Sequence, residues 1–448
     1  MLYLSFAGLL VGLLVFILLC FKKVNTILAA VVSVSIMLLA SLPLLRESGL
    51  GFYQMLITGA KEQGFSSYMD GVGGFLKNYL LLFMLSALYG TVMEDSGAVR
   101  RLTLSLTKLI KKRKNVKFYA TCLLPLFYTI LGYCGISGFV MVFAVVALGR
   151  ELFSECNVPW RFYCYGAVGN MTNGIIAGNL QAQNLKATAL FGVSASAGAA
   201  MSLVFAAVQL TAALMIYFDV RRSERRGEGF LPNGAAIMKA QLKEPLPDEK
   251  LPSTFCAALP LLVTVGLILF LKLSAEATLL CAIVLCFVLF HRQMEKPMET
   301  LGTGLQAGVA PVVTVAAVAG LATIIPEMPG FTLITNAIDH LPNVYGGVLL
   351  IAVITVLVAN PVPVFSSEGI TSILMDKFSS LSAGNAARLS LCSQAIPCPP
   401  WNAGAINAVA LTKLEFKTAA WYYFKATTFP GLVALAVVLG LVQLDLFV

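Results

Sequence analysis

The sequence predicts an all-α polytopic membrane protein made of two inverted-topology repeats with re-entrant hairpins and interrupted helices. First, 58% of the 448 residues are hydrophobic and only 12% are charged, whereas soluble domains carry about 25% charged residues. Second, apolar runs of about 20 residues, the length that a membrane-spanning helix needs, recur along the chain. Third, stretches rich in glycine, amides and proline interrupt these runs at corresponding places in two halves of the chain.

The first half, residues 1–218, is expected to form the N-terminal membrane repeat. Leu2–Cys20 and Asn25–Leu45 are each long enough to span. Lys22 and Lys23 place the turn between them inside the cell and the N-terminus outside, because short basic loops stay cytoplasmic. The other expected elements are a mixed surface segment over Glu47–Lys77, spans over Asn78–Met93 and Phe118–Leu131, a helix over Phe139–Leu148, a connection over Arg150–Pro159, and apolar runs over Phe162–Val168 and Ala197–Phe218.

Residues 219–252 are polar and rich in Arg and Lys, and we expect a cytoplasmic linker there. Residues 253–448 are expected to form the C-terminal inverted membrane repeat. Its expected elements are spans over Ser253–Leu271, Ala275–Phe290, Gly302–Ile325, Val344–Ala359 and Pro430–Leu446, a mixed segment over Phe331–Leu341 and an apolar run over Leu389–Ile396.

The charges of the loops predict that the halves are inverted. The loop after Met93 is strongly basic over Lys108–Lys117, whereas the matching segment after Ile325 has no Lys or Arg before Lys377. Corresponding loops are therefore expected on opposite sides of the membrane, as inverted repeats require. The predicted location is the cell (inner or plasma) membrane, crossed several times.

Four interruptions are expected to meet at a substrate site: Gly135–Gly138, Asn170–Asn184, Asn360–Thr371 and Ser393–Asn407. Broken helices in inverted halves bind substrate near the membrane midplane, and helix N-termini there favour an anion. The alternative is that these amides only satisfy broken backbone or pack helices. The candidate substrate-binding residues are Gly135, Ser137, Gly138, Asn170, Thr172, Asn173, Gly174, Asn179, Gln181, Gln183, Asn360, Ser366, Ser367, Ser393, Gln394, Asn402 and Asn407.

Three charged residues near the interruptions are functional candidates. Glu368 is the candidate coupling-ion residue, because an acid inside the membrane can exchange a proton or hold a cation; the alternative is a glutamate at an exposed mouth. Arg161 and Arg388 precede the amide-rich interruptions of the two halves. They could draw an anion inward or anchor the chain at the membrane interface.

Signatures of enzymes and metal proteins are missing from the sequence. It contains no His-Glu-x-x-His, Walker or Gly-x-Ser-x-Gly motif. Its ten cysteines are scattered without a Cys-x-x-Cys pair. We therefore expect a protein that is not an enzyme, with no catalytic residues, metal or cofactor. The net charge of +9 is explained by orientation signals, so no nucleic-acid partner is expected.

Several segments together resemble those of a known family: Gly71-Val72-Gly73-Gly74, Met93-Glu94-Asp95-Ser96-Gly97, Gly135–Glu151, Gly166, and Thr172-Asn173-Gly174 with Asn179 and Gln183. In these residues the chain resembles the gluconate permease family of proton symporters, within the ion-transporter superfamily of citrate, arsenite and dicarboxylate carriers. The resemblance implies inverted repeats, re-entrant hairpins and a homodimer with a moving transport domain. The family has histidines where Asn173 and Asn179 stand. Asparagine does not titrate, so any proton coupling must lie elsewhere.

The expected function is therefore secondary active symport of small organic anions, gluconate-like or other hydroxycarboxylates, coupled to protons or sodium across the lipid bilayer. Within the same superfamily, a dicarboxylate, citrate or small amino-acid carrier is the alternative. Two alternatives come from other classes, a channel-like facilitator and a membrane-integral enzyme. Dependence on an ion gradient would distinguish a symporter from a facilitator. Conversion of a substrate would identify an enzyme.

Overall fold

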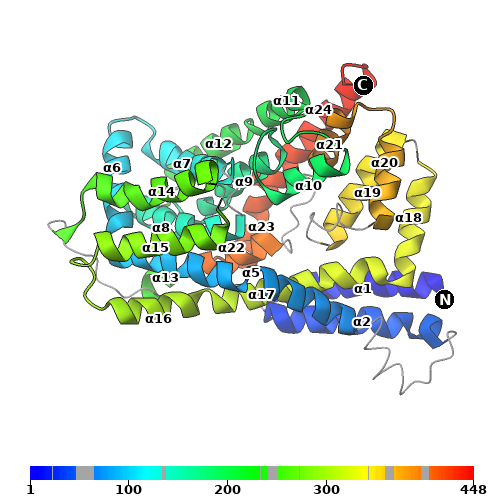
Figure 1. The fold of residues 1–448 in the computed structure, drawn as a ribbon, viewed down its shortest axis with the longest axis horizontal. Helices are drawn as coiled ribbons and strands as arrows, with labels where there is room; N and C mark the ends of the chain where they lie inside the picture. Colours follow the sequence, from blue (N-terminus) through cyan, green and yellow to red (C-terminus); the bar gives the residue numbers. More distant parts are fainter. Residues whose placement is uncertain are drawn as a thin grey trace.

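The computed structural model describes residues 1–22, 24–46, 65–133, 138–232, 234–240, 250–271, 273–341, 343–358, 368–394 and 403–447. Within these ranges all regular secondary structure is helical, which confirms the predicted all-α class. In Figure 1 the helices α9, α10, α21 and α23 lie near the centre, and α1 and α2 lie side by side at the lower right.

The helices of the first half follow the predicted order. They are α1 (Leu2–Phe21), α2 (Thr26–Arg46), α5 (Phe65–Asp95), α6 (Ala98–Ile110), α7 (Val116–Tyr133), α8 (Gly138–Glu155), the 3₁₀ helix η1 (Trp160–Gly166), α9 (Ala167–Ile175), α10 (Ala182–Leu190), α11 (Ala199–Gln209), α12 (Ala212–Arg225) and α13 (Ala235–Ala240). Two expectations were wrong in extent. Helix α5 begins well before residue 78, and α8 continues to Glu155 through the expected connection.

The second half begins with a hairpin, α14 (Thr254–Leu271) and α15 (Ala275–Leu289). It continues with α16 (Pro297–Ala307), α17 (Val309–Ile324), the short 3₁₀ helices η3 (Ile325–Glu327) and η4 (Pro329–Phe331), α18 (Thr332–Asp339), α19 (Asn343–Val358), α20 (Glu368–Lys377), α21 (Ala383–Ser393), α22 (Ala403–Thr412), α23 (Phe416–Tyr423), the π-helix η6 (Phe424–Thr428) and α24 (Phe429–Gln443).

The order of long and short helices over 65–225 recurs over 297–443. Each stretch opens with a long helical region, α5 or α16–α17, and ends with another, α11–α12 or α23–α24. The short helices before the second interruption are α9 and α21, and those after it are α10 and α22. The inverted orientation of the two stretches stays a prediction, as does the division at residues 219 and 252, although α12 continues past the expected boundary to Arg225.

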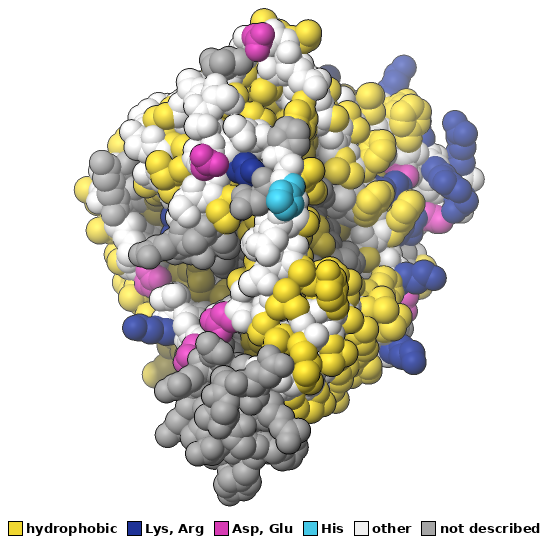
Figure 2. All heavy atoms as spheres, turned by 90° about the vertical axis from the view of Figure 1, so that its right-hand side faces the viewer, with side chains coloured by type: hydrophobic (Ala, Val, Ile, Leu, Met, Phe, Trp, Pro, Cys, Tyr) yellow, Lys and Arg dark blue, Asp and Glu magenta, His cyan; other side chains and the backbone are white. Residues whose placement is uncertain are grey.

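Seven helical regions in the described residues are long and apolar enough to cross a membrane. They are Leu2–Phe21, Thr26–Leu44, Tyr68–Asp95, Val116–Tyr133, Ala199–Arg225, Pro297–Glu327 and Phe416–Gln443. Hydrophobic side chains cover much of the face in Figure 2, and Lys and Arg side chains gather mainly along its right-hand edge. The chain is thus a multi-pass membrane protein, as predicted.

The two halves pack directly against each other through α5 and α17. Small residues permit this close approach: a Cβ added at Gly308 would lie 2.6 Å from the Phe83 carbonyl oxygen, and one at Gly320 would lie 2.6 Å from the Tyr68 ring. Small residues at helix crossings let backbones approach closely in membrane proteins. The first half is therefore not an isolated unit beside the second.

Candidate functional site

The predicted interruption in the first half lies over residues 176–181, between α9 and α10. Gly178 adopts a positive φ of 84°, which glycine tolerates without strain, and its N–H donates to the Ala195 carbonyl over 2.8 Å. Asn179 serves the same turn: its amide nitrogen donates to the Ile176 carbonyl, and its Oδ1 accepts from the Gln181 N–H over 2.9 Å. Both side-chain amide atoms of Asn179, a predicted substrate ligand, are therefore hydrogen-bonded to the backbone.

The structure brings the two interruptions of the first half together. A Cβ added at Gly132, near the end of α7, would lie 2.4 Å from Asn173 Nδ2 and 2.8 Å from Gln181 Nε2. One added at Gly138, where α8 begins, would lie 2.8 Å from Asn170 Oδ1. We call these five residues, Gly132, Gly138, Asn170, Asn173 and Gln181, the amide site. Four of them were predicted from the sequence, and Gly132 was not.

Two buried amide atoms of this site have no hydrogen-bond partner among the described residues. Asn173 is fully buried; its Nδ2 donates to the Tyr128 carbonyl over 2.6 Å, while its Oδ1 is unpaired. Gln181 Nε2 is likewise buried and unpaired. An unmade hydrogen bond costs about 1–3 kcal/mol in a protein interior. A small polar ligand with hydroxyl or carboxylate groups could donate to Asn173 Oδ1 and accept from Gln181 Nε2.

The remaining predicted residues divide into three groups. Thr172 and Ser393 donate within their own helices, to the carbonyls of Val168 and Leu389, over 2.8 and 2.7 Å. Gln183 faces Gly174, since a Cβ there would lie 3.0 Å from its Oε1. Gln394 ends α21 with a buried Nε2 that lacks a partner in the described part of the chain, and Asn407 is buried in α22.

Several candidates cannot be placed. Glu368 is the first residue of α20, but its side chain lies outside the described residues. So do the predicted residues Gly135, Ser137, Asn360, Ser366, Ser367 and Asn402.

Arg388, in the second half of the chain, forms hydrogen bonds with backbone carbonyls near the interruption between α9 and α10. Its side chain is fully buried in α21. The guanidinium donates through Nε to the Ala197 carbonyl over 2.6 Å, through Nη1 to that of Ile175 over 3.1 Å, and through Nη2 to that of Ala195 over 2.6 Å. Of the two alternatives for Arg388, anchoring at the membrane interface does not fit, because its side chain lies inside the protein.

The electrostatics at this position favour an anion. Burial lowers the pKa of Arg388, yet a guanidinium stays protonated in proteins. No described carboxylate lies within ion-pair distance of it, and its partners are neutral carbonyls, including the last one of α9. The N-termini of α8 and α10 also lie at the interruptions, and a helix N-terminus carries about half a positive charge. The C-termini of α7 and α9 lie at the same interruptions and each carries about half a negative charge, so the Arg388 guanidinium is the positive charge that favours an anion here.

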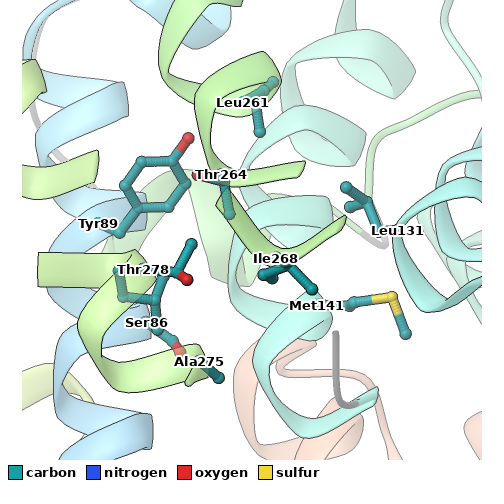
Figure 3. Close-up of a pocket in the computed structure, with 10 residues that line it drawn as sticks. Ser86, Tyr89, Leu131, Met141, Leu261, Thr264, Ile268, Ala275 and Thr278 are labelled. Atoms are coloured by element: carbon teal, nitrogen blue, oxygen red, sulfur yellow. The ribbon is translucent and has the colours of Figure 1, made fainter. Parts of the chain in front are cut away.

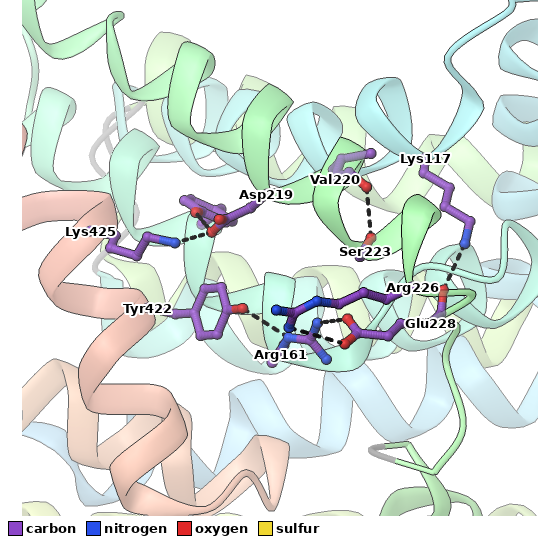
Figure 4. Close-up of polar contacts among 10 residues, drawn as sticks. Lys117, Arg161, Asp219, Val220, Ser223, Arg226, Glu228, Tyr422 and Lys425 are labelled. Atoms are coloured by element: carbon purple, nitrogen blue, oxygen red, sulfur yellow. Dashed lines mark hydrogen bonds and ion pairs between the residues drawn. The ribbon is translucent and has the colours of Figure 1, made fainter.

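A second polar group, which we call the charged cluster, comprises Arg161, Tyr165, Asp219, Glu228, Tyr422 and Lys425 (Figure 4). Arg161 forms an ion pair with Glu228, and its Nε donates to the Tyr422 hydroxyl over 2.8 Å. Burial alone would lower the pKa of Arg161, but these two partners raise it above its ordinary value. Arg161 therefore joins η1 to α23 in the second half.

Asp219 and Lys425 form the other ion pair of the charged cluster. The Tyr165 hydroxyl donates to Asp219 Oδ2 over 2.5 Å, and Lys425 Nζ lies 5.1 Å from the Tyr422 ring centroid and 5.9 Å from that of Trp421. Sequence reasoning missed this pair, since it placed Asp219 in the linker. Opposite charges next to the predicted apolar segments Ala197–Phe218 and Pro430–Leu446 were the available signal.

A separate cavity of about 30 Å³ lies between α5, α7, α8, α14 and α15 (Figure 3). Its lining is almost wholly apolar, with the hydroxyls of Ser86, Tyr89, Thr264 and Thr278 as exceptions. A cavity of that volume admits about one or two water molecules. It is too small for a gluconate-sized substrate and contains none of the predicted site residues.

Comparison with known proteins gives one partial likeness. No family model matches this chain. Over 171 residues the chain is 30% identical to a Bacillus subtilis (strain 168) protein named "Uncharacterized transporter YxjC". The match covers 37% of this chain and 35% of that protein. The likeness is thus to about a third of a protein whose name assigns transport and no substrate.

Proposed function

We propose that this protein is a secondary active transporter, a symporter that moves small organic anions with protons or sodium ions. Gluconate-like and other hydroxycarboxylates are the leading substrates. The observation that carries the proposal is the amide site, where two helix interruptions meet around unpaired buried atoms of Asn173 and Gln181. The partial likeness to a protein named as a transporter supports it.

The lining of the amide site explains the choice of substrate class. Amides can donate to a carboxylate and accept from hydroxyls, and the buried charge of Arg388 favours an anion over a neutral sugar. Glu368 at the start of α20 is the coupling residue proposed from the sequence. We also propose that the two halves are inverted repeats and that the protein is a homodimer. In carriers built from repeats, the substrate site lies where one repeat moves against the other.

Uptake of radiolabelled gluconate, citrate, succinate and glutamate into proteoliposomes tests this function. We expect gluconate to accumulate only under an imposed proton or sodium gradient. Uptake that never exceeds equilibration would favour a facilitator, and preference for citrate, succinate or glutamate would move the substrate class. Absence of uptake for all four would contradict the proposal.

A further inference from the structure

The charged cluster contains an ion pair at an unusual place. Asp219 lies in the helical region Ala199–Arg225 and Lys425 in Phe416–Gln443, both long and apolar enough to span a membrane. Their side chains are only 15% and 22% exposed. Ionisable residues within membrane segments are costly to bury, and they mark proton or ion pathways more often than they serve packing.

The local backbone also sets Lys425 apart. It lies in η6, a π-helical segment over Phe424–Thr428 between α23 and α24. Such π-bulges within α-helices occur frequently at functional sites. Segment η6 packs against α9, the helix that carries Asn170 and Asn173 of the amide site. A change at Lys425 can therefore reach the proposed substrate site through one helix contact.

We propose that Asp219 and Lys425 form the proton-coupling site of this transporter, with Asp219 as the group that takes up and releases the proton. The inference rests on the proposed function, assigns its coupling ion and places the coupling group at Asp219 instead of Glu368. A proton from water binds the Asp219 carboxylate, forming an O–H bond and neutralising it. The Lys425 ammonium then has lost its counter-charge, and the protein has gained one positive charge for an anionic substrate to balance. Release of the proton to water on the other side restores the pair.

The surroundings of Asp219 fit this exchange. Tyr165 on η1 holds the carboxylate oxygen by a hydrogen bond. Tyr422 on α23 interacts electrostatically with Asp219, Arg161 and Glu228. Lys117 on α7 donates to the Glu228 carbonyl over 2.9 Å, so it is engaged with backbone (Figure 4). Arg221 and Arg222 follow Asp219 on its own helix.

The neighbouring pair supplies a matched control. Arg161 and Glu228 also join η1 to the start of the linker, but Glu228 forms ion pairs with two guanidiniums, those of Arg161 and Arg226, and it lies beyond the helical region Ala199–Arg225 that is long enough to span. Glu228→Gln should therefore leave proton coupling intact, whereas Asp219→Asn should remove it. Asp219→Glu retains a carboxylate and should restore coupling in part, which separates loss of the proton site from a folding defect.

The transport arm uses proteoliposomes and radiolabelled gluconate. Asp219→Asn should still exchange internal for external gluconate but lose accumulation driven by an inward proton gradient, down to the level of protein-free liposomes. Three results would contradict the assignment to Asp219 and Lys425 while leaving transport established. They are proton-driven accumulation by Asp219→Asn equal to that of wild type, loss of this accumulation in Glu368→Gln alone, and accumulation driven only by sodium. Failure of wild type to move any organic anion would instead strike the proposed function.

A second arm needs no substrate. Trp421 lies beside Lys425, so its emission should change with pH in the purified wild-type protein when protonation of Asp219 frees the ammonium. That change should vanish in Asp219→Asn and in Trp421→Phe and persist in Glu228→Gln. A titration that is unaltered in Asp219→Asn would overturn the proposal, whatever the transport assay shows.

Discussion

The interruption between α9 and α10 and the charged cluster each involve an arginine, and the two arginines make opposite kinds of contact. Arg388 is fully buried and binds three backbone carbonyls at the amide-rich interruption, and burial lowers its pKa. Arg161 is partly exposed and binds a carboxylate and a phenol, and its pKa is raised. The sequence presents both as arginines that precede an amide-rich interruption, so their positions suggest equivalence where the structure shows none.

The difference separates two tasks. The amide site is neutral in its side chains and holds unpaired polar atoms, and the Arg388 guanidinium binds the last carbonyl of α9, the helix that carries Asn170 and Asn173. This arrangement suits binding of an anion. The charged cluster has its charges matched, Asp219 with Lys425 and Arg161 with Glu228. Such matched pairs suit a switch, because gain of one proton changes the net charge by a full unit.

The largest difference between the two regions should come from removing each arginine. Arg388→Met leaves the carbonyls of Ile175 and Ala197 without this donor, and each unsatisfied group costs about 1–3 kcal/mol. We expect a sharp fall in the thermal midpoint of the detergent-purified protein and in the yield of folded protein. Arg161→Met is the matched control. Equal losses in the two variants would end the distinction between them.

The next largest effect should come from filling the amide site. Gly132→Ala places a Cβ 2.4 Å from Asn173 Nδ2, so the amide must move. Substrate uptake should be lost while the protein still folds. Gly73→Ala, where a Cβ meets nothing within 4 Å, should leave uptake unchanged. Normal uptake by Gly132→Ala would place the substrate elsewhere.

A smaller effect is expected from one amide alone. Asn173→Ala removes the unpaired Oδ1 and one donor, and loss of a ligand hydrogen bond of about 1–1.5 kcal/mol weakens binding roughly tenfold. The concentration dependence of uptake measures this. Thr172→Val is the control, since its hydroxyl bonds only within α9. Equal loss of expression and uptake in Asn173→Ala would mean that this amide serves packing.

The smallest effect should come from breaking the ion pair between Arg161 and Glu228. Exposed and partly exposed pairs contribute about 1 kcal/mol or less, and salt screens them. Glu228→Gln should therefore shift the thermal midpoint slightly, and less at high ionic strength. A shift as large as that of Arg388→Met would show that the charged cluster, too, holds the fold together.

Much of the fold followed from hydropathy, because a membrane helix must satisfy its backbone internally and so needs a long apolar run. The bounds of the helices α1, α14 and α15 were predicted nearly to the residue, although α14 and α15, expected as spans, are not among the seven regions of the described residues that are long and apolar enough to cross a membrane. The long extent of α5 was not, since its first turns are mixed in polarity and its tertiary contacts with α17 could not be read from the chain.

The residues of the candidate site could largely be predicted from the sequence, but the contacts that they make could not. Polar residues in apolar runs identified Asn170, Asn173 and Gln181, but only the fold shows that Asn179 and Thr172 are occupied by backbone. Arg388 was identified from the sequence as a cation that precedes an interruption. Its three carbonyl partners, 191, 193 and 213 residues away in the chain, carry no local signal.

The most direct measurement is gradient-driven uptake of radiolabelled gluconate by proteoliposomes that contain wild type, Gly132→Ala or Gly73→Ala protein. Ion-coupled anion transport through the amide site predicts accumulation by wild type and Gly73→Ala, its collapse when the gradient is dissipated, and none by folded Gly132→Ala. Equal accumulation by all three proteins, or accumulation that survives dissipation of every ion gradient, would contradict it.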